Sequence, residues 1–459
     1  MINIKELILN NRFLSGHQRT VKLKKNIIAS LLIQGISVVI GFFMVRVSLG
    51  YLDQTKYGVW LTISSLLVWF NFFEIGLGNG LKNKLAEALA KKDFELGKIY
   101  VSTTYAILSI IIGIVFVIFI IVNNFIDWTI ILNTETNLAK ELSSLALIVF
   151  SFFFLRFVLK LVGIVLVADQ RPAISNLFGP MGNLISLIII YILTKISYGS
   201  LLYLGIALSG VPIIVLSIAT IYFFSHDYKK ISPSINSIDF KYSKELLNLG
   251  VKFFLIQITS LIFYQTSNII ISQYFGPAQV TPYNIAYKYF STIIMLFTII
   301  INPFWAAFTE AWVIEDVLWV KRAINKLLFV WGGMVLLSVF MFFISDQFFD
   351  LWIGTELMQS IEISLTLKLS LIIYFTLLTF GGVFNMFING VGKIRLQGIT
   401  LLFGALLFIP LVILFINVFN WGIESVVIAM ILTNIYHPII APLQYYKLVN
   451  KKADGIWDR

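Results

Sequence analysis

Long apolar runs dominate the chain and restrict it to a membrane fold. A helix needs about 20 apolar residues to cross a bilayer, and about a dozen runs meet that length. Only helices and closed barrels satisfy their backbone hydrogen bonds in lipid, and runs of this length favour helices. We therefore predict an all-α integral membrane protein with twelve transmembrane helices. The predicted spans are 26–48, 59–78, 101–123, 144–167, 173–194, 201–224, 251–273, 283–305, 327–345, 363–387, 396–417 and 423–446.

The composition excludes several other classes of protein. Of the 459 residues, 59% are hydrophobic and only 12% are charged, whereas a soluble domain carries about 25% charged residues. No soluble domain of useful size fits between the runs. The chain has no cysteine and three histidines, so we expect no histidine-built metal site and no cofactor. It has no Walker-type loop, HExxH sequence or nucleophile elbow, which argues against an ATPase or protease.

The positive charges in the loops predict the orientation. Most of the 34 lysines and arginines lie in the termini and loops on one side of the spans, and only Lys56, Lys140 and Lys195 lie on the other. Short cytoplasmic loops carry such an excess. Both termini are therefore predicted to be cytoplasmic, and this topology explains the net charge of +11 without a nucleic-acid partner. Residues 1–25 are polar and basic, so we expect no cleaved signal peptide.

Apart from Lys252 and Glu424, each the second residue of its span, five cations and one acid lie inside the predicted spans. A charge at membrane depth costs roughly 3 kcal/mol or more unless it faces protein or water. An interior of this sign suggests a path for an anionic substrate. We predict that the five cations line a substrate cavity: Arg156, Lys160, Arg46, Lys288 and Lys368.

The pair in the fourth span carries most of this prediction. Arg156 lies mid-way along the span, and Lys160 follows one turn later on the same face. A guanidinium binds phosphate oxygens through its fork. The alternative is a structural ion pair with Glu74 or a polar group of another helix. For Lys288 and Lys368, in the outer thirds of their spans, the alternative is a side chain that reaches the membrane interface.

Three further residues are candidates for coupling or gating. Glu74, near the cytoplasmic end of the second span, is either a protonatable group or a carboxylate that pairs with Lys82 or Lys84. Glu310, at the end of the eighth span, has the same two readings. His437 precedes Pro438, a kink signal that is common in transporters. The acids of residues 346–362, which begin with Asp346, are expected to lie in a solvated outer loop.

An internal repeat divides the chain. Leu-Ile-Gln at 32–34 recurs at 255–257, and Tyr51 recurs as Tyr274 at the same offset. Two six-span lobes of equal orientation would be related by an axis along the membrane normal. Chance similarity between apolar sequences is the alternative. The predicted lobes are 1–224 and 244–459, joined by a cytoplasmic linker at 225–243.

Four short motifs, in order along the chain, resemble those of a known family. They are Tyr57-Gly58-Val59-Trp60, Glu74-Ile75-Gly76-Leu77-Gly78, the segment from Asn302-Pro303-Phe304 to Glu310, and Asn389-Gly390-Val391-Gly392-Lys393. The chain resembles the O-antigen and polysaccharide flippases of the multidrug/oligosaccharidyl-lipid/polysaccharide (MOP) exporter superfamily. It departs from the pattern at Thr309, where serine is commoner.

This resemblance implies a MATE-like fold with alternating access between two lobes in a bacterial inner membrane. It implies a polyprenyl-pyrophosphate-linked oligosaccharide as cargo, moved from the cytoplasmic to the periplasmic leaflet. Membrane lipids and other polysaccharide assembly proteins would be its partners, and coupling to H⁺ or Na⁺ stays open. A drug exporter of the same superfamily is one alternative, although its cationic cargo would call for acids in the bundle. A glycan polymerase or ligase is another, although the short outer loops oppose it.

Overall fold

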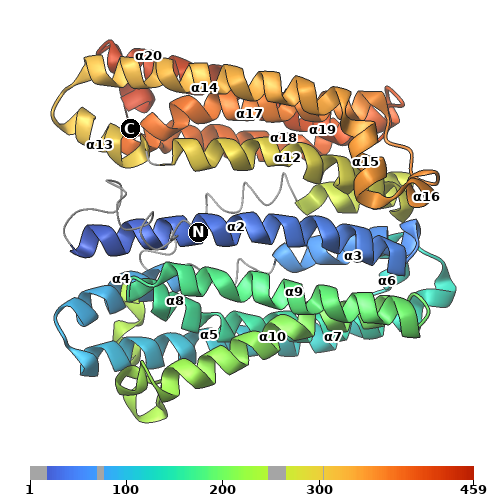
Figure 1. Ribbon diagram of the computed structural model, residues 1–459, viewed down its shortest axis with the longest axis horizontal. Coiled ribbons are helices and arrows are strands. Elements are labelled where there is room, and N and C mark those ends of the chain that lie inside the picture. The colour runs from blue at the N-terminus through green and yellow to red at the C-terminus, as the bar shows by residue number, and fades with distance from the viewer. Residues whose placement is uncertain (1–17, 70–76, 247–264, 303, 459) are drawn as a thin grey trace, which may run out of the picture. The chain divides into compact units, whose positions relative to one another are not determined.

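Helices make up the regular structure of the described chain, and no strand occurs in it (Figure 1). The computed structural model describes residues 18–69, 77–246, 265–302 and 304–458. The longer helices of the first half are α2 (Gln18–Tyr51), α3 (Gln54–Trp69), α4 (Leu77–Ala90), α5 (Phe94–Asn123), α6 (Trp128–Leu132), α7 (Ala139–Leu159), α8 (Leu161–Ala168), α9 (Pro172–Ile196) and α10 (Leu201–Ser225). Those of the second half are α12 (Val280–Ile301), α13 (Phe304–Val313), α14 (Val317–Phe343), α15 (Ser345–Ile353), α16 (Thr355–Met358), α17 (Leu365–Val391), α18 (Arg395–Asn417), α19 (Glu424–Thr433) and α20 (Ala441–Val449).

Ten stretches of described helix are long and apolar enough to cross a membrane. The predicted spans absent from this set are 59–78 and 251–273, and each includes residues outside the described ones. Exposed apolar side chains on the outer faces of the spans are suited to contact with lipid. On α10, for example, Ile214, Ile218 and Ile221 lie on one side of the helix and are each more than half exposed. The predicted all-α membrane architecture is confirmed, and twelve spans fit it.

The chain forms two compact units. The first consists of residues 1–53, 70–130 and 135–254, and the second of 54–69, 131–134 and 255–459. In the first unit α2 runs beside α9, and α10 packs against α7 and α9 (Figure 1). Aromatic rings fill the contact between α5 and α7, where Phe119 stacks on Phe150 with ring centroids 4.5 Å apart.

The stretch 225–243 is a folded part of the first unit. Its backbone is tied to polar side chains near the start of α5. The Ser234 amide donates to Ser102 Oγ at 3.0 Å, and the Asp239 amide donates to Thr103 Oγ1 at 3.0 Å. The residues predicted to connect two lobes therefore also cover the end of one helix.

The second unit is built around α17. This helix packs against α12, α13, α14, α19 and α20. Phe308, Phe387 and Tyr436 are almost fully buried in the core there. The predicted helix irregularity at His437-Pro438 is a π-helical turn over Tyr436–Ile440.

The two halves of predicted span 59–78 lie in different units. The first half is α3, which groups with the second unit. Gln54 Nε2 donates to the Ala278 carbonyl at 3.0 Å, and Thr281 Oγ1 donates to the Gln54 carbonyl at 2.8 Å. Gly58 allows this approach, because a Cβ there would overlap the Pro277 carbonyl.

Near the end of that span, α4 begins at Leu77 and packs on α5 and α8 of the first unit. Gly80 has a similar role here, because a Cβ at this position would overlap the backbone of Leu246. The units therefore differ from the predicted lobes 1–224 and 244–459 at α3. The predicted symmetry axis between lobes stays a prediction.

Candidate functional site

Arg156 is an exposed cation in the last turn of α7. The packed side of α7 consists of Phe150, Phe154 and Phe157, which are buried. Among the residues that the structure describes, Arg156 has neither an ion-pair nor a side-chain hydrogen-bond partner. The predicted alternative partner, Glu74, lies outside the described residues.

The chain changes from α7 to α8 at Lys160. The Lys160 amide donates to the Arg156 carbonyl at 2.9 Å, and the Gly163 amide donates to the Lys160 carbonyl at 2.9 Å. Helical conformation thus continues through the junction. Residues 160, 163, 164 and 167 are spaced as one helix face, and Arg156 lies one turn before them. The sequence prediction that Arg156 and Lys160 share a face agrees with this geometry.

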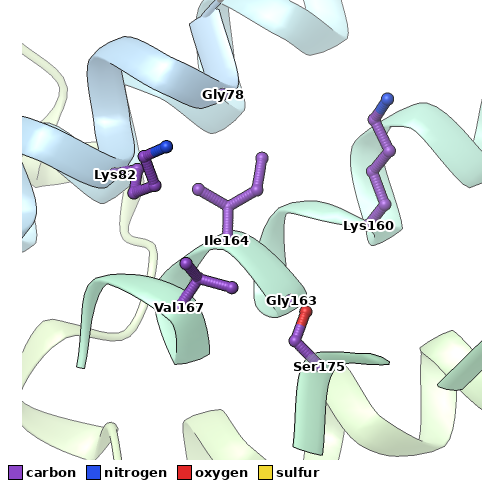
Figure 2. A pocket seen from close by; sticks show the side chains of 7 residues that line it. All are labelled: Gly78, Lys82, Lys160, Gly163, Ile164, Val167 and Ser175. Atoms are coloured by element: carbon purple, nitrogen blue, oxygen red, sulfur yellow. The ribbon is translucent and has the colours of Figure 1, made fainter. Parts of the chain in front are cut away.

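That face of α8 borders a pocket of about 280 Å³ inside the first unit (Figure 2). Figure 2 shows Lys82 of α4 and Lys160 on opposite sides of Ile164, with the Ser175 hydroxyl of α9 beside Gly163. Both lysines are partly buried. The described lining includes these two lysines and no carboxylate. The lining residues are Gly78, Lys82, Lys160, Gly163, Ile164, Val167 and Ser175.

Lys160 also contacts an aromatic ring. Its Nζ lies 4.4 Å from the centroid of Phe157. A cation–π contact fixes the position of an ammonium group while its N–H bonds can still point elsewhere. The contact with Phe157 therefore helps to hold the Lys160 side chain near the pocket.

Acids close to this end of the first unit are engaged by other cations. Arg171, in the α8–α9 turn, pairs with Asp169 at 3.1 Å and with Asp227 at 2.5 Å. The hydrogen bond that Arg171 donates to Asp227 raises the pKa of Arg171 above its usual value. Because these carboxylates face Arg171, their charge is partly compensated there.

Lys84 on α4 forms ion pairs with two acids. Its Nζ lies 3.4 Å from Glu245 and 3.8 Å from Glu87. Burial lowers the pKa of Lys84, but the hydrogen bond to Glu245 and the two negative charges outweigh it, so the net shift is upward. Lys82 and Lys84 therefore have different surroundings, although only one residue separates them.

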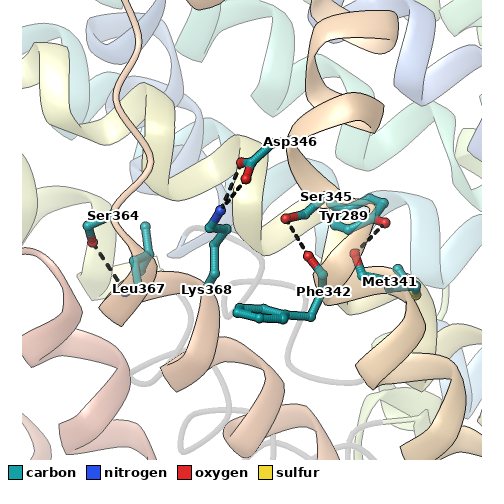
Figure 3. A network of polar contacts seen from close by, with 8 residues as sticks. All are labelled: Tyr289, Met341, Phe342, Ser345, Asp346, Ser364, Leu367 and Lys368. Carbon is teal, nitrogen blue, oxygen red and sulfur yellow. Dashed lines mark hydrogen bonds and ion pairs between the residues drawn. The ribbon is translucent and has the colours of Figure 1, made fainter.

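Lys368 has a different environment in the second unit. It is 6% exposed, and its Nζ donates to both oxygens of Asp346 at 2.8 and 2.9 Å (Figure 3). Ser364 caps the same helix by accepting from the Leu367 amide. The ion pair joins the first turn of α17 to the first turn of α15. The acid expected in a solvated loop is indeed largely exposed, but it also compensates a buried lysine.

The remaining predicted residues lie apart from the pocket. Arg46 is exposed on α2, and Lys288 is partly buried on α12; neither is among the described lining residues. Glu310 lies on α13. Nδ1 of His437 is buried with no hydrogen-bond partner among the described residues. The cargo, coupling and gating roles of these residues stay predictions.

Six of the seven described lining residues were not predicted as site residues. Lys82 lies outside the predicted spans, and the other five carry no charge. The spacing of 160, 163, 164 and 167 was the available signal, since it puts a glycine and a lysine on one face. Only the tertiary structure shows that α4 and α9 meet that face.

Solved structures with the same fold are transporters. An inward-facing MATE family multidrug transporter of the MOP superfamily matches with a TM-score of 0.73 and 14% identity, covering 93% of this chain and all of the other. A MOP superfamily transporter from Pyrococcus furiosus, described as having a binding pocket of reverse polarity, matches with a TM-score of 0.65 and 14% identity, covering 97% and 98%. The fold is therefore that of the MATE transporters.

Curated relatives of the chain are named for O-antigen transport or export. The chain is 21% identical over 391 residues to the "Putative O-antigen transporter" of Salmonella typhi, covering 80% of this chain and 82% of that protein. It is 25% identical over 281 residues to the "Putative O-antigen export protein" of Yersinia pseudotuberculosis, covering 60% and 62%. No protein-family model matches the chain. The resemblance to O-antigen transporters of the MOP superfamily, predicted from the motifs, is confirmed by these relatives.

Proposed function

We propose that the chain is a flippase for a polyprenyl-pyrophosphate-linked oligosaccharide. It would move this cargo from the cytoplasmic to the periplasmic leaflet of a bacterial inner membrane by alternating access. The observation that carries the proposal is Arg156, an exposed guanidinium within a membrane span that has no partner among the described residues. An uncompensated charge at this depth is costly, so it is best explained by an anionic ligand.

The chemistry of the cargo fits the cations of the first unit. A pyrophosphate offers several acceptor oxygens, and the arginine fork can bind two of them at once. Lys160 lies one turn away and adds a point charge. The polyprenyl chain can stay in lipid, where the exposed apolar faces of the spans already lie. This arrangement would hold the charged head without extracting the lipid tail.

The proposal extends to partners and coupling. Membrane lipids surround the spans, and other polysaccharide assembly proteins would receive the cargo. No resident cofactor is needed. A H⁺ or Na⁺ gradient would supply the free energy, with Glu74, Glu310 and His437 as the residues to test. The predicted orientation places both termini in the cytoplasm.

Export of cationic drugs is the second candidate function, because the solved neighbours include multidrug transporters. Such cargo would be repelled by the cations of this chain. The described pocket in the first unit has two lysines and no carboxylate in its lining, which favours anionic cargo. We therefore rank drug export below the flippase.

Arg156→Ala tests the proposal in a strain that depends on this chain for its surface polysaccharide. We expect the polysaccharide to be lost while the protein level stays unchanged. Arg156→Lys should restore part of it, because the charge returns without the fork. Lys195→Ala is the matched control, since Lys195 is an exposed cation of the same unit at the far end of α9.

Two results would contradict the proposal. Normal polysaccharide and normal protein level in the combined Arg156→Ala and Lys160→Ala variant would exclude a cationic path on this face. Low abundance of the Arg156→Ala protein that is restored by also neutralising a partner acid, such as Glu74, would identify a structural ion pair instead.

A further inference from the structure

The pocket in the first unit has the chemical features of an anion site. Lys82 and Lys160 come from different helices, α4 and the α7–α8 junction, and both line the same space. The Ser175 hydroxyl can donate a hydrogen bond, and Ser175 lies in the first turn of α9, where backbone amides favour an anion. Two lysine side chains and the hydroxyl of a residue in the first turn of a helix therefore line one cavity.

The size of the pocket selects among anionic ligands. Sites for drug-sized ligands occupy about 300–1,000 Å³, and this pocket has about 280 Å³. It can hold a phosphate or pyrophosphate group but not an oligosaccharide. Ile164 and Val167 add apolar surface on one side, which suits the first carbons of a lipid tail attached to the phosphate.

The position of the pocket relates it to Arg156. α8 ends at Ala168, next to the α8–α9 turn that is predicted to be cytoplasmic. Arg156 lies on the opposite, membrane-inward side of Lys160, on the same helix face. An anion bound at Lys82 and Lys160 would thus be one helical turn from the arginine.

We propose that the Lys82–Lys160 pocket is an entry subsite for the phosphate head of a lipid-linked substrate. It would hold the head at the cytoplasmic end of the first unit before Arg156 takes it further into the membrane. The assignment of the cargo rests on the proposed function, whereas phosphate binding by the pocket can be tested by itself.

A cysteine-protection experiment is direct because the native chain has no cysteine. Ser175→Cys is made in the full chain, purified in detergent, and labelled with a maleimide. Ile164→Cys gives a second reporter if the first variant folds poorly, and Ser232→Cys in the 225–243 stretch is the control outside the pocket. The probes are inorganic phosphate, inorganic pyrophosphate, farnesyl pyrophosphate and phosphatidylglycerol in mixed micelles.

We expect both pyrophosphates to slow labelling of Ser175→Cys and to leave Ser232→Cys unaffected. Farnesyl pyrophosphate should act at the lowest concentration, because it adds an apolar tail. Lys82→Gln or Lys160→Gln should each raise the required concentration about tenfold, as expected for the loss of one charge-assisted hydrogen bond.

Other results would overturn the proposal. No protection by any phosphate, or equal protection in Lys82→Gln, would show that the pocket is not a phosphate site. Protection by phosphatidylglycerol but not by the pyrophosphates would identify a site for bilayer lipid. The proposed function is judged separately. Loss of polysaccharide in Arg156→Ala without protection of Ser175→Cys would refute the subsite alone. Protection of Ser175→Cys with normal polysaccharide in Arg156→Ala would refute the flippase.

Discussion

The two units treat their membrane cations in opposite ways. In the first, Arg156 is exposed and has no partner among the described residues, and Lys160 lines a pocket without a carboxylate in its described lining. In the second, Lys368 is almost fully buried and donates to both oxygens of Asp346. Arg156 and Lys368 therefore differ in whether a described carboxylate compensates the charge.

The acids of the first unit explain the difference. Asp169 and Asp227 face Arg171, and Glu245 faces Lys84. These carboxylates are engaged by other cations near the predicted cytoplasmic surface. In the second unit the carboxylate of Asp346 turns toward the buried lysine instead. Removing each charge and measuring stability and binding tests this difference between the units.

The largest expected effect on stability is that of Asp346→Asn. This change leaves Lys368 buried without its carboxylate, so we expect a loss of about 2 kcal/mol. The thermal unfolding midpoint in detergent, followed by tryptophan fluorescence, should fall. Asp350→Asn is the matched control, because Asp350 is an exposed acid on the same helix, and its midpoint should not change. Equal midpoints for both variants would refute the structural tie.

Lys368→Met should destabilise less, by about 1 kcal/mol, because the acid it leaves behind is largely exposed to water. The double variant with Asp346→Asn should be no less stable than Lys368→Met alone. Such non-additivity is the signature of a direct pair. Independent, additive losses in the double-mutant cycle would mean that the two residues act separately.

Arg156→Ala should change the free energy of unfolding by no more than about 0.5 kcal/mol, because an exposed side chain without a described partner contributes little to folding. Its thermal unfolding midpoint should therefore stay unchanged, whereas that of Asp346→Asn should fall. The midpoint is measured on the purified variant in detergent, as for Asp346→Asn. A large drop in midpoint would show that Arg156 is a structural residue, and the contrast between the units would disappear.

Lys84→Gln should also have only a small effect on stability. This lysine is partly exposed in its pairs with Glu245 and Glu87, and such pairs contribute about 0–1 kcal/mol. Protection of Ser175→Cys by pyrophosphate should persist in Lys84→Gln and weaken in Lys82→Gln. If both variants weakened it equally, general positive charge rather than the pocket would explain binding.

Much of the architecture could be predicted from the sequence because lipid leaves few alternatives. Each apolar run of sufficient length must become a helix, and most of the predicted spans appear as described helices. The shared face of Arg156 and Lys160 followed from a spacing of four residues. Such local rules need no knowledge of what surrounds a helix.

Tertiary relationships could not be predicted in the same way. The pairing of Lys368 with Asp346 depends on how the start of α15 folds back, and hydropathy does not report this. Lys82 became a site residue only because α4 meets α8. The predicted lobes also treated the span 59–78 as indivisible, whereas its first half groups with the second unit.

The placement of α3 has a consequence for how the protein is made. Gln54 lies 227 residues before its partner Thr281. At about 5–20 residues per second, synthesis of that interval takes about 10–45 s. Trp60 and Ile63, buried in the finished protein, must meanwhile be covered by lipid or by the insertion machinery. If the gene were cut within the stretch encoding 225–243, the N-terminal product would carry a helix whose partners are on the other product. The two products would then have to be synthesised together to assemble.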